Sequence, residues 1–113
     1  MTLGDYNVLT VDAVLRDVPA TPPFPPASDR ASWAEVCADI GAGKTGELLA
    51  AGEAAAATPL PPLPATLYLD FHRTGQREGY QNPFFVRRRI LADLVLAECV
   101  EHKGRFLDPI MDT

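Results

Sequence analysis

Residues 64–104 read PATLYLDFHRTGQREGYQNPFFVRRRILADLVLAECVEHKG and carry the longest helical pattern of the chain. Asn82 can cap a helix by accepting a hydrogen bond from its first free backbone N–H groups, and Pro83 suits the first helical position, where its missing N–H costs nothing. Gly104 can adopt the left-handed conformation that closes a helix. The stretch therefore predicts a helix of ~20 residues, or ~30 Å, between Asn82 and Gly104.

The apolar residues of this expected helix surround its axis almost completely. A helix that is apolar on every side needs neighbours on every side. The rest of the chain offers few, so we expect part of this surface to require cover from outside these 113 residues. The residues concerned are Ile90, Leu91, Ala92, Leu94, Val95, Leu96 and Ala97.

The composition indicates one modest domain that is rich in proline. The 113 residues are 47% hydrophobic and include 11 prolines, about twice the usual share of ~5%. Most prolines fall within residues 19–64, where they interrupt regular structure. We therefore predict an all-α fold, in which short helices and one long helix are joined by Pro-rich extended linkers. The net charge of −5 argues against a general nucleic-acid binder, which would be basic.

The sequence shows no sign of a membrane segment, a metal site or another cofactor site. No signal-peptide pattern follows Met1, and no segment approaches the ~20 apolar residues that a membrane span needs. The chain as written is thus predicted to be cytoplasmic, or periplasmic or secreted if the true N-terminus is missing. Cys37 and Cys99 are expected to be small buried hydrophobic residues, although a disulfide between them stays open. His72 and His102 have no closely spaced ligand partners, which argues against zinc.

The N-terminal part is expected to be an arm followed by a linker. Residues 2–18 carry valines and a leucine at spacings of three and four, which suits a short helix, although a strand is possible. Residues 20–27 contain PPFPP, typical of a polyproline-like spacer. We expect Phe24 to pin this spacer to a surface, with a ligand for a proline-binding domain as the less favoured alternative.

The remaining segments alternate between helix and connection. Ser28 or Asp29 is expected to cap a helix that ends at Gly41, with Trp33 anchored in the core. An alanine-rich helix should follow over residues 45–57. Residues 65–71 alternate weakly and predict a strand or an extended arm, and residues 73–79 predict a polar turn. Asp108 and Pro109 indicate the start of another helix.

Residues 38–45, ADIGAGKT, match a relaxed nucleotide-binding pattern. A working phosphate loop needs a buried strand before it, so that the backbone N–H groups converge on phosphate. Here the preceding residues predict a helix, and Ala38 stands where the strict pattern has glycine. We therefore favour a glycine-rich turn between two helices. The histidines offer little more, because His72 could act as a base only if Asp70 shared its face of an extended segment.

The arginines of the central stretch are the more informative polar residues. Arg73 and Arg77 flank a short loop, and loop arginines suit carboxylates or sulfates because the guanidinium donates two parallel hydrogen bonds. The consecutive Arg87, Arg88 and Arg89 point in directions ~100° apart. At least one of these three must face inward or pair with a carboxylate such as Asp93. A structural role at helix ends is the favoured alternative for all of them.

Residues 63–110, LPATLYLDFHRTGQREGYQNPFFVRRRILADLVLAECVEHKGRFLDPI, resemble the heparinase II/III-like family of polysaccharide lyases. The resemblance rests on the LPAxLYLxF start, the RTGxR turn, the RR pair of the long helix and the GRFLDxI step, and it covers roughly residues 33–113. It implies that residues 28–113 begin an incomplete α/α toroid that is truncated at its C-terminus. Residues 1–27 would form an N-terminal arm and Pro-rich linker.

The family cleaves acidic, uronate-containing polysaccharides by β-elimination. The resemblance therefore implies an N-terminal fragment of such a lyase, not catalytic alone, because the family's catalytic tyrosine and histidine lie beyond the matched region. The implied partner is an acidic polysaccharide, contacted by Arg73, Gln76 and Arg77 in the turn. The alternative is a small helical protein-interaction module that binds a partner or self-associates through the long helix.

Overall fold

The computed structural model describes Arg16 and residues 22–113, and every regular element in this part is a helix. The elements are α2 (Arg30–Ala57), α3 (Ala65–Thr74), α4 (Glu78–Glu101) and α5 (Leu107–Asp112). The all-α prediction is confirmed. The helix expected within residues 2–18 lies outside the described residues, apart from Arg16.

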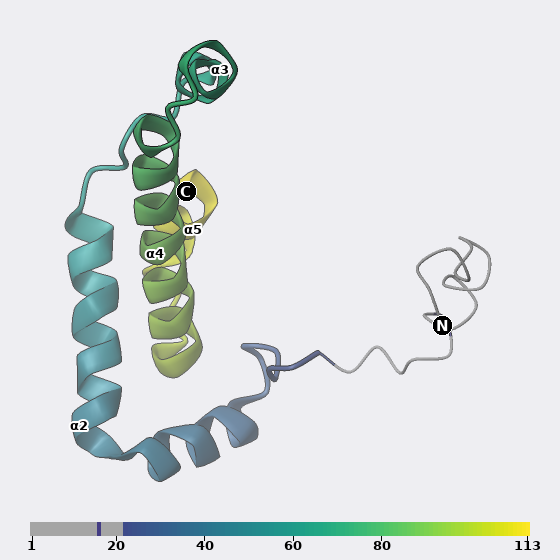
Figure 1. Cartoon of the computed structure of the whole chain (residues 1–113). Helices are drawn as coiled ribbons and strands as arrows, with labels where there is room; N and C mark the ends of the chain where they lie inside the picture. The colour runs from purple at the N-terminus through teal and green to yellow at the C-terminus, as the bar shows by residue number, and fades with distance from the viewer. Residues whose placement is uncertain (1–15, 17–21) are drawn as a thin grey trace.

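Helix α2 is bent, and its two halves lie differently relative to α4. Its second half runs antiparallel to α4, while its first half crosses below the end of α4 (Figure 1). The bend is at Gly41, whose φ of 83° and ψ of 163° are essentially restricted to glycine. The predicted glycine-rich turn is thus a single non-helical residue, after which Gly43 and Lys44 are already helical.

The ends of α2 follow from local chemistry. The Asp29 carboxylate accepts hydrogen bonds from the Ser32 backbone N–H (3.1 Å) and from its hydroxyl (2.7 Å), as the predicted cap requires. These bonds also lower the pKa of the Asp29 carboxyl. At the other end, the Thr58 hydroxyl donates to the Ala54 carbonyl (2.7 Å), and Pro59 prevents a further turn.

Trp33 is an anchor of the first half of α2, as predicted. Its side chain is buried, and its indole N–H donates to the Pro26 carbonyl at 3.2 Å. The Arg30 guanidinium reaches across to α4 and donates to the carbonyls of Cys99 (2.7 Å) and Val100 (3.1 Å). These contacts tie the crossing half of α2 to the C-terminal end of α4, where carbonyls lack helical partners.

The prediction of a strand or extended arm over residues 65–71 is wrong, because these residues belong to α3. Their weak alternation is too short to exclude a helix, and Leu67 and Phe71 are spaced i, i+4 on one helix face. The helix ends at Gly75, which adopts the left-handed conformation (φ 77°) and donates its N–H to the Phe71 carbonyl at 3.0 Å. The predicted polar turn shrinks to residues 75–77.

The long helix α4 begins at Glu78, four residues before the predicted cap at Asn82. Pro83 therefore lies inside the helix, where it removes one hydrogen bond. The Arg77 carbonyl opens the extra turn by accepting the N–H groups of Tyr80 (3.1 Å) and Gln81 (2.9 Å). Helix α4 also ends earlier than Gly104, at Glu101, because His102 takes the left-handed conformation with φ 55°.

The turn from α4 to α5 is organised by a buried carboxylate. Glu98 is buried and accepts hydrogen bonds from the backbone N–H groups of Gly104 (2.7 Å) and Phe106 (3.2 Å). Helix α5 then starts one residue before Asp108, close to the predicted position. Buried Phe106 is thereby held against the core.

The core lies between the second half of α2, α4 and α5. Its closest contact is at Gly52, where a Cβ atom would overlap the Cβ of Ala97 and lie 3.4 Å from the Asp93 carbonyl oxygen. Such proximity lets α2 and α4 pack with their backbones close together. The buried members of the core are Ala55, Ile90, Leu94, Ala97 and Phe106, with Leu49, Leu60 and Ile110 packed against them.

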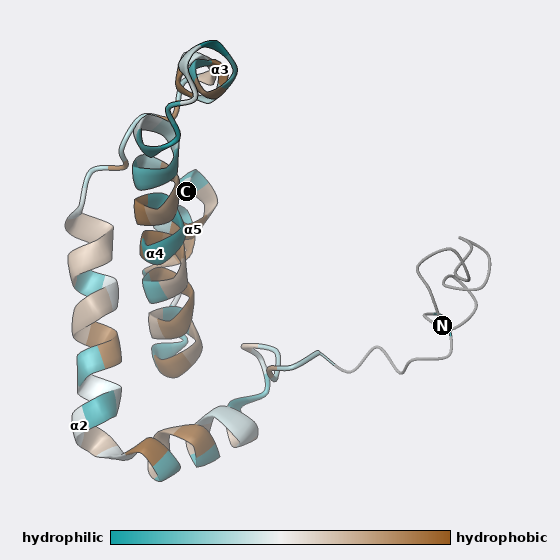
Figure 2. Cartoon of the chain, viewed as in Figure 1, coloured by the Kyte–Doolittle hydropathy of each residue, from teal (hydrophilic) through white to brown (hydrophobic). Residues whose placement is uncertain are grey.

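Only one face of α4 is covered within the described residues. Leu91, Val95 and Leu96 remain 37%, 39% and 36% exposed, although Leu94 between them is buried. Figure 2 shows hydrophobic residues along α4 and also in the first half of α2. The expectation that this helix lacks cover is confirmed for this part of the chain. No described helix is long and apolar enough to cross a membrane.

The Gly52 contact generates a stability prediction. Gly52→Ala places a methyl group where Ala97 already stands, so α2 and α4 must move apart, at a cost of about 1–3 kcal/mol in the free energy of unfolding. The matched control is Gly46→Ala in the same helix, whose new Cβ meets no atom within 4 Å. Because alanine favours helix, this control should stabilise by about 0.5–1 kcal/mol. Urea unfolding followed by circular dichroism measures both, and equal effects of the two substitutions would contradict the packing described.

Candidate functional site

The tight turn between α3 and α4 brings aromatic side chains of the two helices together. Residues 75–77 connect the helices, and Leu67 of α3 lies close to Gly79 of α4. A hollow of about 300 Å³ opens on the hairpin they form. We call it the aromatic groove, and it is lined by Tyr68, Phe71, Tyr80, Phe84 and Phe85 together with Arg77 and Gln81.

The rings of the groove support one another. Tyr80 meets the edge of Tyr68 with ring centroids 5.4 Å apart, and stacks on Phe84 at 5.7 Å with an interplanar angle of 18°. Contacts of this geometry stabilise by about 0.5–1.5 kcal/mol each beyond burial. Tyr68 and Phe85 nevertheless remain 54% and 56% exposed. The groove is therefore an ordered apolar surface that is open to solvent.

Two arginines border the aromatic rings. The guanidinium carbon of Arg77 lies 4.9 Å from the centre of the Phe71 ring, and that of Arg88 lies 5.6 Å from the centre of the Phe84 ring. Both distances suit cation–π contacts. Among the described residues, neither guanidinium has a hydrogen bond or an ion pair. The N–H groups of Arg77, which lines the groove, and of Arg88, beside the Phe84 ring, are therefore free to bind an acidic ligand.

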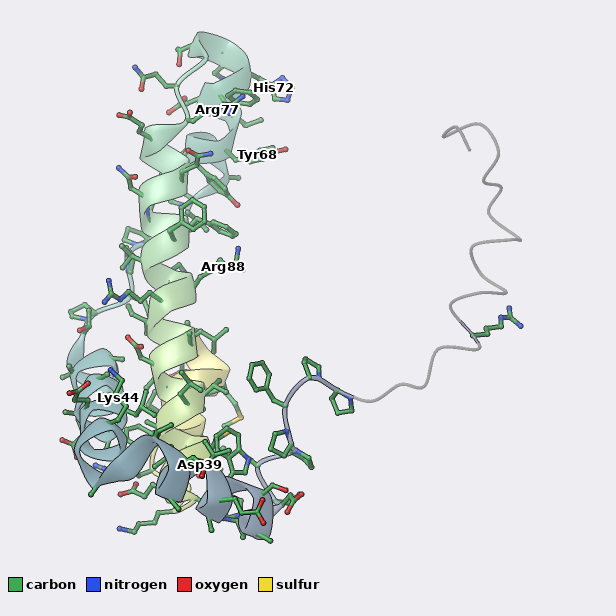
Figure 3. All side chains as sticks on the ribbon, turned by 60° about the horizontal axis from the view of Figure 1, so that its bottom comes forward. Asp39, Lys44, Tyr68, His72, Arg77 and Arg88 are labelled. Carbon is green, nitrogen blue, oxygen red and sulfur yellow. The ribbon has the colours of Figure 1, made fainter. Side chains whose placement is uncertain are left out.

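The three residues predicted to contact substrate do not act as one cluster. Arg73 lies in the last turn of α3, where its exposed guanidinium is 3.9 Å from the Asp70 carboxylate. Gln76 is exposed in the turn, and its backbone N–H donates to the Thr74 hydroxyl at 3.3 Å. Arg77 alone of the three lines the groove. In Figure 3, Tyr68, His72 and Arg77 lie at the same end of the molecule, and Arg88 lies farther along α4.

The pairing considered for Asp70 and His72 is wrong. It required an extended segment, whereas these residues are in α3, where positions i and i+2 point ~200° apart. His72 is exposed, and its ring lies 6.0 Å from that of Phe71. The geometry therefore gives His72 no orienting carboxylate.

At least one of the three consecutive arginines of α4 was expected to face inward or to pair with a carboxylate, and Arg87 does face inward. Arg87 is half-buried and donates hydrogen bonds to the carbonyls of Pro61 (3.0 Å) and Thr113 (3.2 Å). It thus connects the Pro-rich linker, α4 and the residue after α5. Arg89 is exposed, and the described residues include no ion pair between it and Asp93.

The residues of the relaxed nucleotide-binding pattern do not form a phosphate loop. They follow a helix, and their own backbone is helical after Gly41. Lys44 is exposed and pairs with Glu47 at 2.7 Å. The preference for a turn between helices is therefore confirmed, and Figure 3 places Asp39 and Lys44 far from the aromatic groove.

The two cysteines are free and half-buried rather than fully buried. Burial raises the pKa of the Cys99 thiol, with Glu98 adding to the effect and the Arg30 guanidinium opposing it. The thiol of Cys99 is therefore protonated at neutral pH and a poor nucleophile. Within Arg16 and residues 22–113, no group of three or more His, Cys, Asp or Glu residues could hold a metal ion.

Sequence reasoning missed the aromatic residues of the groove. The signal was present, because Tyr80 and Phe84 are spaced i, i+4, and Tyr68 and Phe71 are spaced i, i+3, as neighbours on one helix face are. It could be used only once residues 65–71 were assigned to a helix. Treating them as extended separated Tyr68 from Phe71 and hid the groove.

Comparisons with models of known protein families and with curated proteins gave no match to this chain. The resemblance of residues 63–110 to the heparinase II/III-like lyases consequently rests on the quoted motifs alone.

Proposed function

We propose that this chain is the N-terminal helical part of a heparinase II/III-like lyase, and that it binds acidic polysaccharide without cleaving it alone. The observation that carries the proposal is the position of Arg77. This residue belongs to the RTGxR turn on which the family resemblance rests. Its guanidinium borders the aromatic groove and has no hydrogen bond or ion pair within the described residues. The all-helical architecture with antiparallel neighbours is compatible with the start of an α/α toroid.

The chemistry of the groove suits a charged sugar. Aromatic rings offer flat apolar surfaces with specific geometry, and a pyranose ring has flat C–H faces that can lie against them. A uronate carboxylate or a sulfate can accept two parallel hydrogen bonds from one guanidinium. Mostly apolar walls with a few polar groups at the edge are typical of small-ligand sites.

Apart from Arg77, which could neutralise a carboxylate, the described residues do not supply the groups that β-elimination needs. The reaction requires a base for the proton beside the uronate carboxylate, a group that neutralises this carboxylate, and an acid for the leaving oxygen. Tyr68 and Tyr80 line the groove and His72 lies next to Phe71, but within residues 22–113 none of the three has an orienting carboxylate or a guanidinium bonded to it. We therefore assign these residues no catalytic role.

The proposal predicts that Arg77→Ala weakens binding of a heparan sulfate or alginate oligosaccharide by at least tenfold. The lost charge-assisted hydrogen bonds correspond to about 1.5–3 kcal/mol. Arg89→Ala is the matched control, because it removes the same charge from an exposed position of α4 outside the groove. Isothermal titration calorimetry with each oligosaccharide measures the affinities. Equal losses in the two variants would show only non-specific attraction and would contradict the proposed site.

A second prediction concerns turnover. The 113-residue chain, incubated with the same polysaccharides, should produce no absorbance from unsaturated uronate products. The reason is that the groove contains binding groups but no arranged base and acid. Steady formation of that product by the purified chain would contradict the claim that the chain is not catalytic alone.

The exposed face of α4 favours a second candidate function, a helical module that self-associates. Leu91, Val95 and Leu96 give this face an apolar stripe that the described residues cover only in part, and such stripes mark interfaces. Under the first proposal, the same stripe would be covered by further helices of a toroid.

This second candidate predicts that Leu91→Lys combined with Val95→Lys abolishes self-association, since two like charges would face each other across the paired helices. Light scattering coupled to size exclusion gives the mass. Met111→Lys is the control, because Met111 is 75% exposed on α5, outside the stripe. A wild-type chain that stays monomeric at high concentration would exclude the candidate.

A further inference from the structure

The Pro-rich segment before α2 projects from the described structure without a surface to rest on. Phe24 is 69% exposed and Pro22, Pro23 and Pro26 are exposed as well, so the expectation that Phe24 pins the segment is not met within the described residues. Phe24 and the prolines around it therefore present an apolar segment to solvent. Such a segment is a suitable ligand for an aromatic-lined groove.

The base of this segment is fixed at the end of the molecule that lies away from the aromatic groove. The Pro26 carbonyl accepts the Trp33 indole N–H (3.2 Å) and the Asp29 N–H (2.9 Å). Arg30 holds the adjacent Ala27 carbonyl (2.8 Å) together with the Cys99 and Val100 carbonyls. Figure 1 shows the same separation, with the segment leaving near the lower end of α4 and α3 at its upper end.

The distance between the Pro-rich segment and the aromatic groove excludes docking of the segment in the groove of its own chain. The groove lies along Tyr80–Phe85 of α4, and the anchor of the segment lies at Cys99 and Val100, roughly 20–30 Å farther along the helix. The four residues before Pro26 can reach at most ~14 Å even when fully extended. Phe24 therefore cannot enter the groove of its own chain while Trp33 and Arg30 keep their contacts.

We propose that the Pro22–Pro26 segment of one copy docks in the aromatic groove of a second copy. Each of the four prolines fixes its own φ before binding, so less conformational freedom is lost on docking than for an ordinary segment. Grooves that recognise such segments are lined by aromatic rings, as this one is by Tyr68, Phe71, Tyr80, Phe84 and Phe85. The hollow of about 300 Å³ is open to solvent, so a ring from another copy can reach it.

The proposed contact joins two different surfaces, so the association is head-to-tail. Each copy has one segment and one groove, and a contact of this kind extends into chains of copies unless a rotation closes a ring. This differs from pairing through the apolar stripe of α4, which joins the same surface on both copies. Arg77 borders the same groove, so an occupied groove would no longer be open to a polysaccharide.

Two single variants and their mixture test the proposal on the full chain. Phe24→Ala removes the ligand ring, and Tyr68→Ala opens the groove at a half-exposed ring, so each should raise the midpoint concentration of association at least tenfold. A 1:1 mixture should form dimers but no larger species, because an intact groove then meets an intact segment only once. Sedimentation velocity over a range of concentrations measures the species. Phe85→Ala replaces Tyr68→Ala if circular dichroism shows that the latter variant is unfolded.

The controls separate this contact from other associations. Met111→Ala, in an exposed position outside the groove, should associate like the wild type. A synthetic peptide of residues 21–28, TPPFPPAS, should dissolve the assemblies, and the same peptide with Phe24→Ala should not. A mixture that remains as monomeric as its components would overturn the proposal. So would association that is unchanged by Phe24→Ala but abolished by Leu91→Lys with Val95→Lys.

Discussion

The close approach of Gly52 to Ala97 is the constraint on which the rest of the structure depends. With few large side chains buried, the core gains its density by bringing two backbones together at small residues. The same contact leaves room for the Phe106 ring, whose edge lies 3.4 Å from the position of a Gly52 Cβ. A larger residue at either position would separate α2 from α4 and uncover the ring that α5 brings into the core.

Backbone carbonyls and N–H groups that helices leave unpaired are satisfied by three charged side chains. Arg30 bonds the last carbonyls of α4, Glu98 bonds the N–H groups that lead into α5, and Arg87 bonds carbonyls of the Pro-rich linker and of Thr113. Unsatisfied groups at these partly buried places would each cost about 1–3 kcal/mol. These three residues therefore have structural roles, and only some of the arginines of α4 remain available to bind a ligand.

The sequence predicts a structural feature of this protein when the residues that determine the feature are neighbours in the chain. Asp29, Gly41 and Trp33 act through neighbours in the chain, and their predicted roles are confirmed. The observed start of α4 lies five residues before the predicted one, because the extra turn depends on Tyr80 packing with Tyr68 of another helix. The role of Gly52 could not be predicted, since eight glycines are present and only the α2–α4 contact distinguishes this one. The aromatic groove was missed for the related reason that it requires α3 to be helical.

The groove and the core occupy different parts of α4, and this separation bears on function. Ile90, Leu94 and Ala97 belong to the core, whereas Tyr80, Phe84 and Phe85 line the groove together with residues of α3. The rings at this end of α4 contact one another with centroids 5.4–5.7 Å apart, so the groove has mutually supporting walls. Substitutions of its exposed rings should consequently alter binding more than global stability. A site built at the end of a helix that continues into the core combines an accessible surface with a fixed position, because the rigid helix transmits the order of the core to its exposed end.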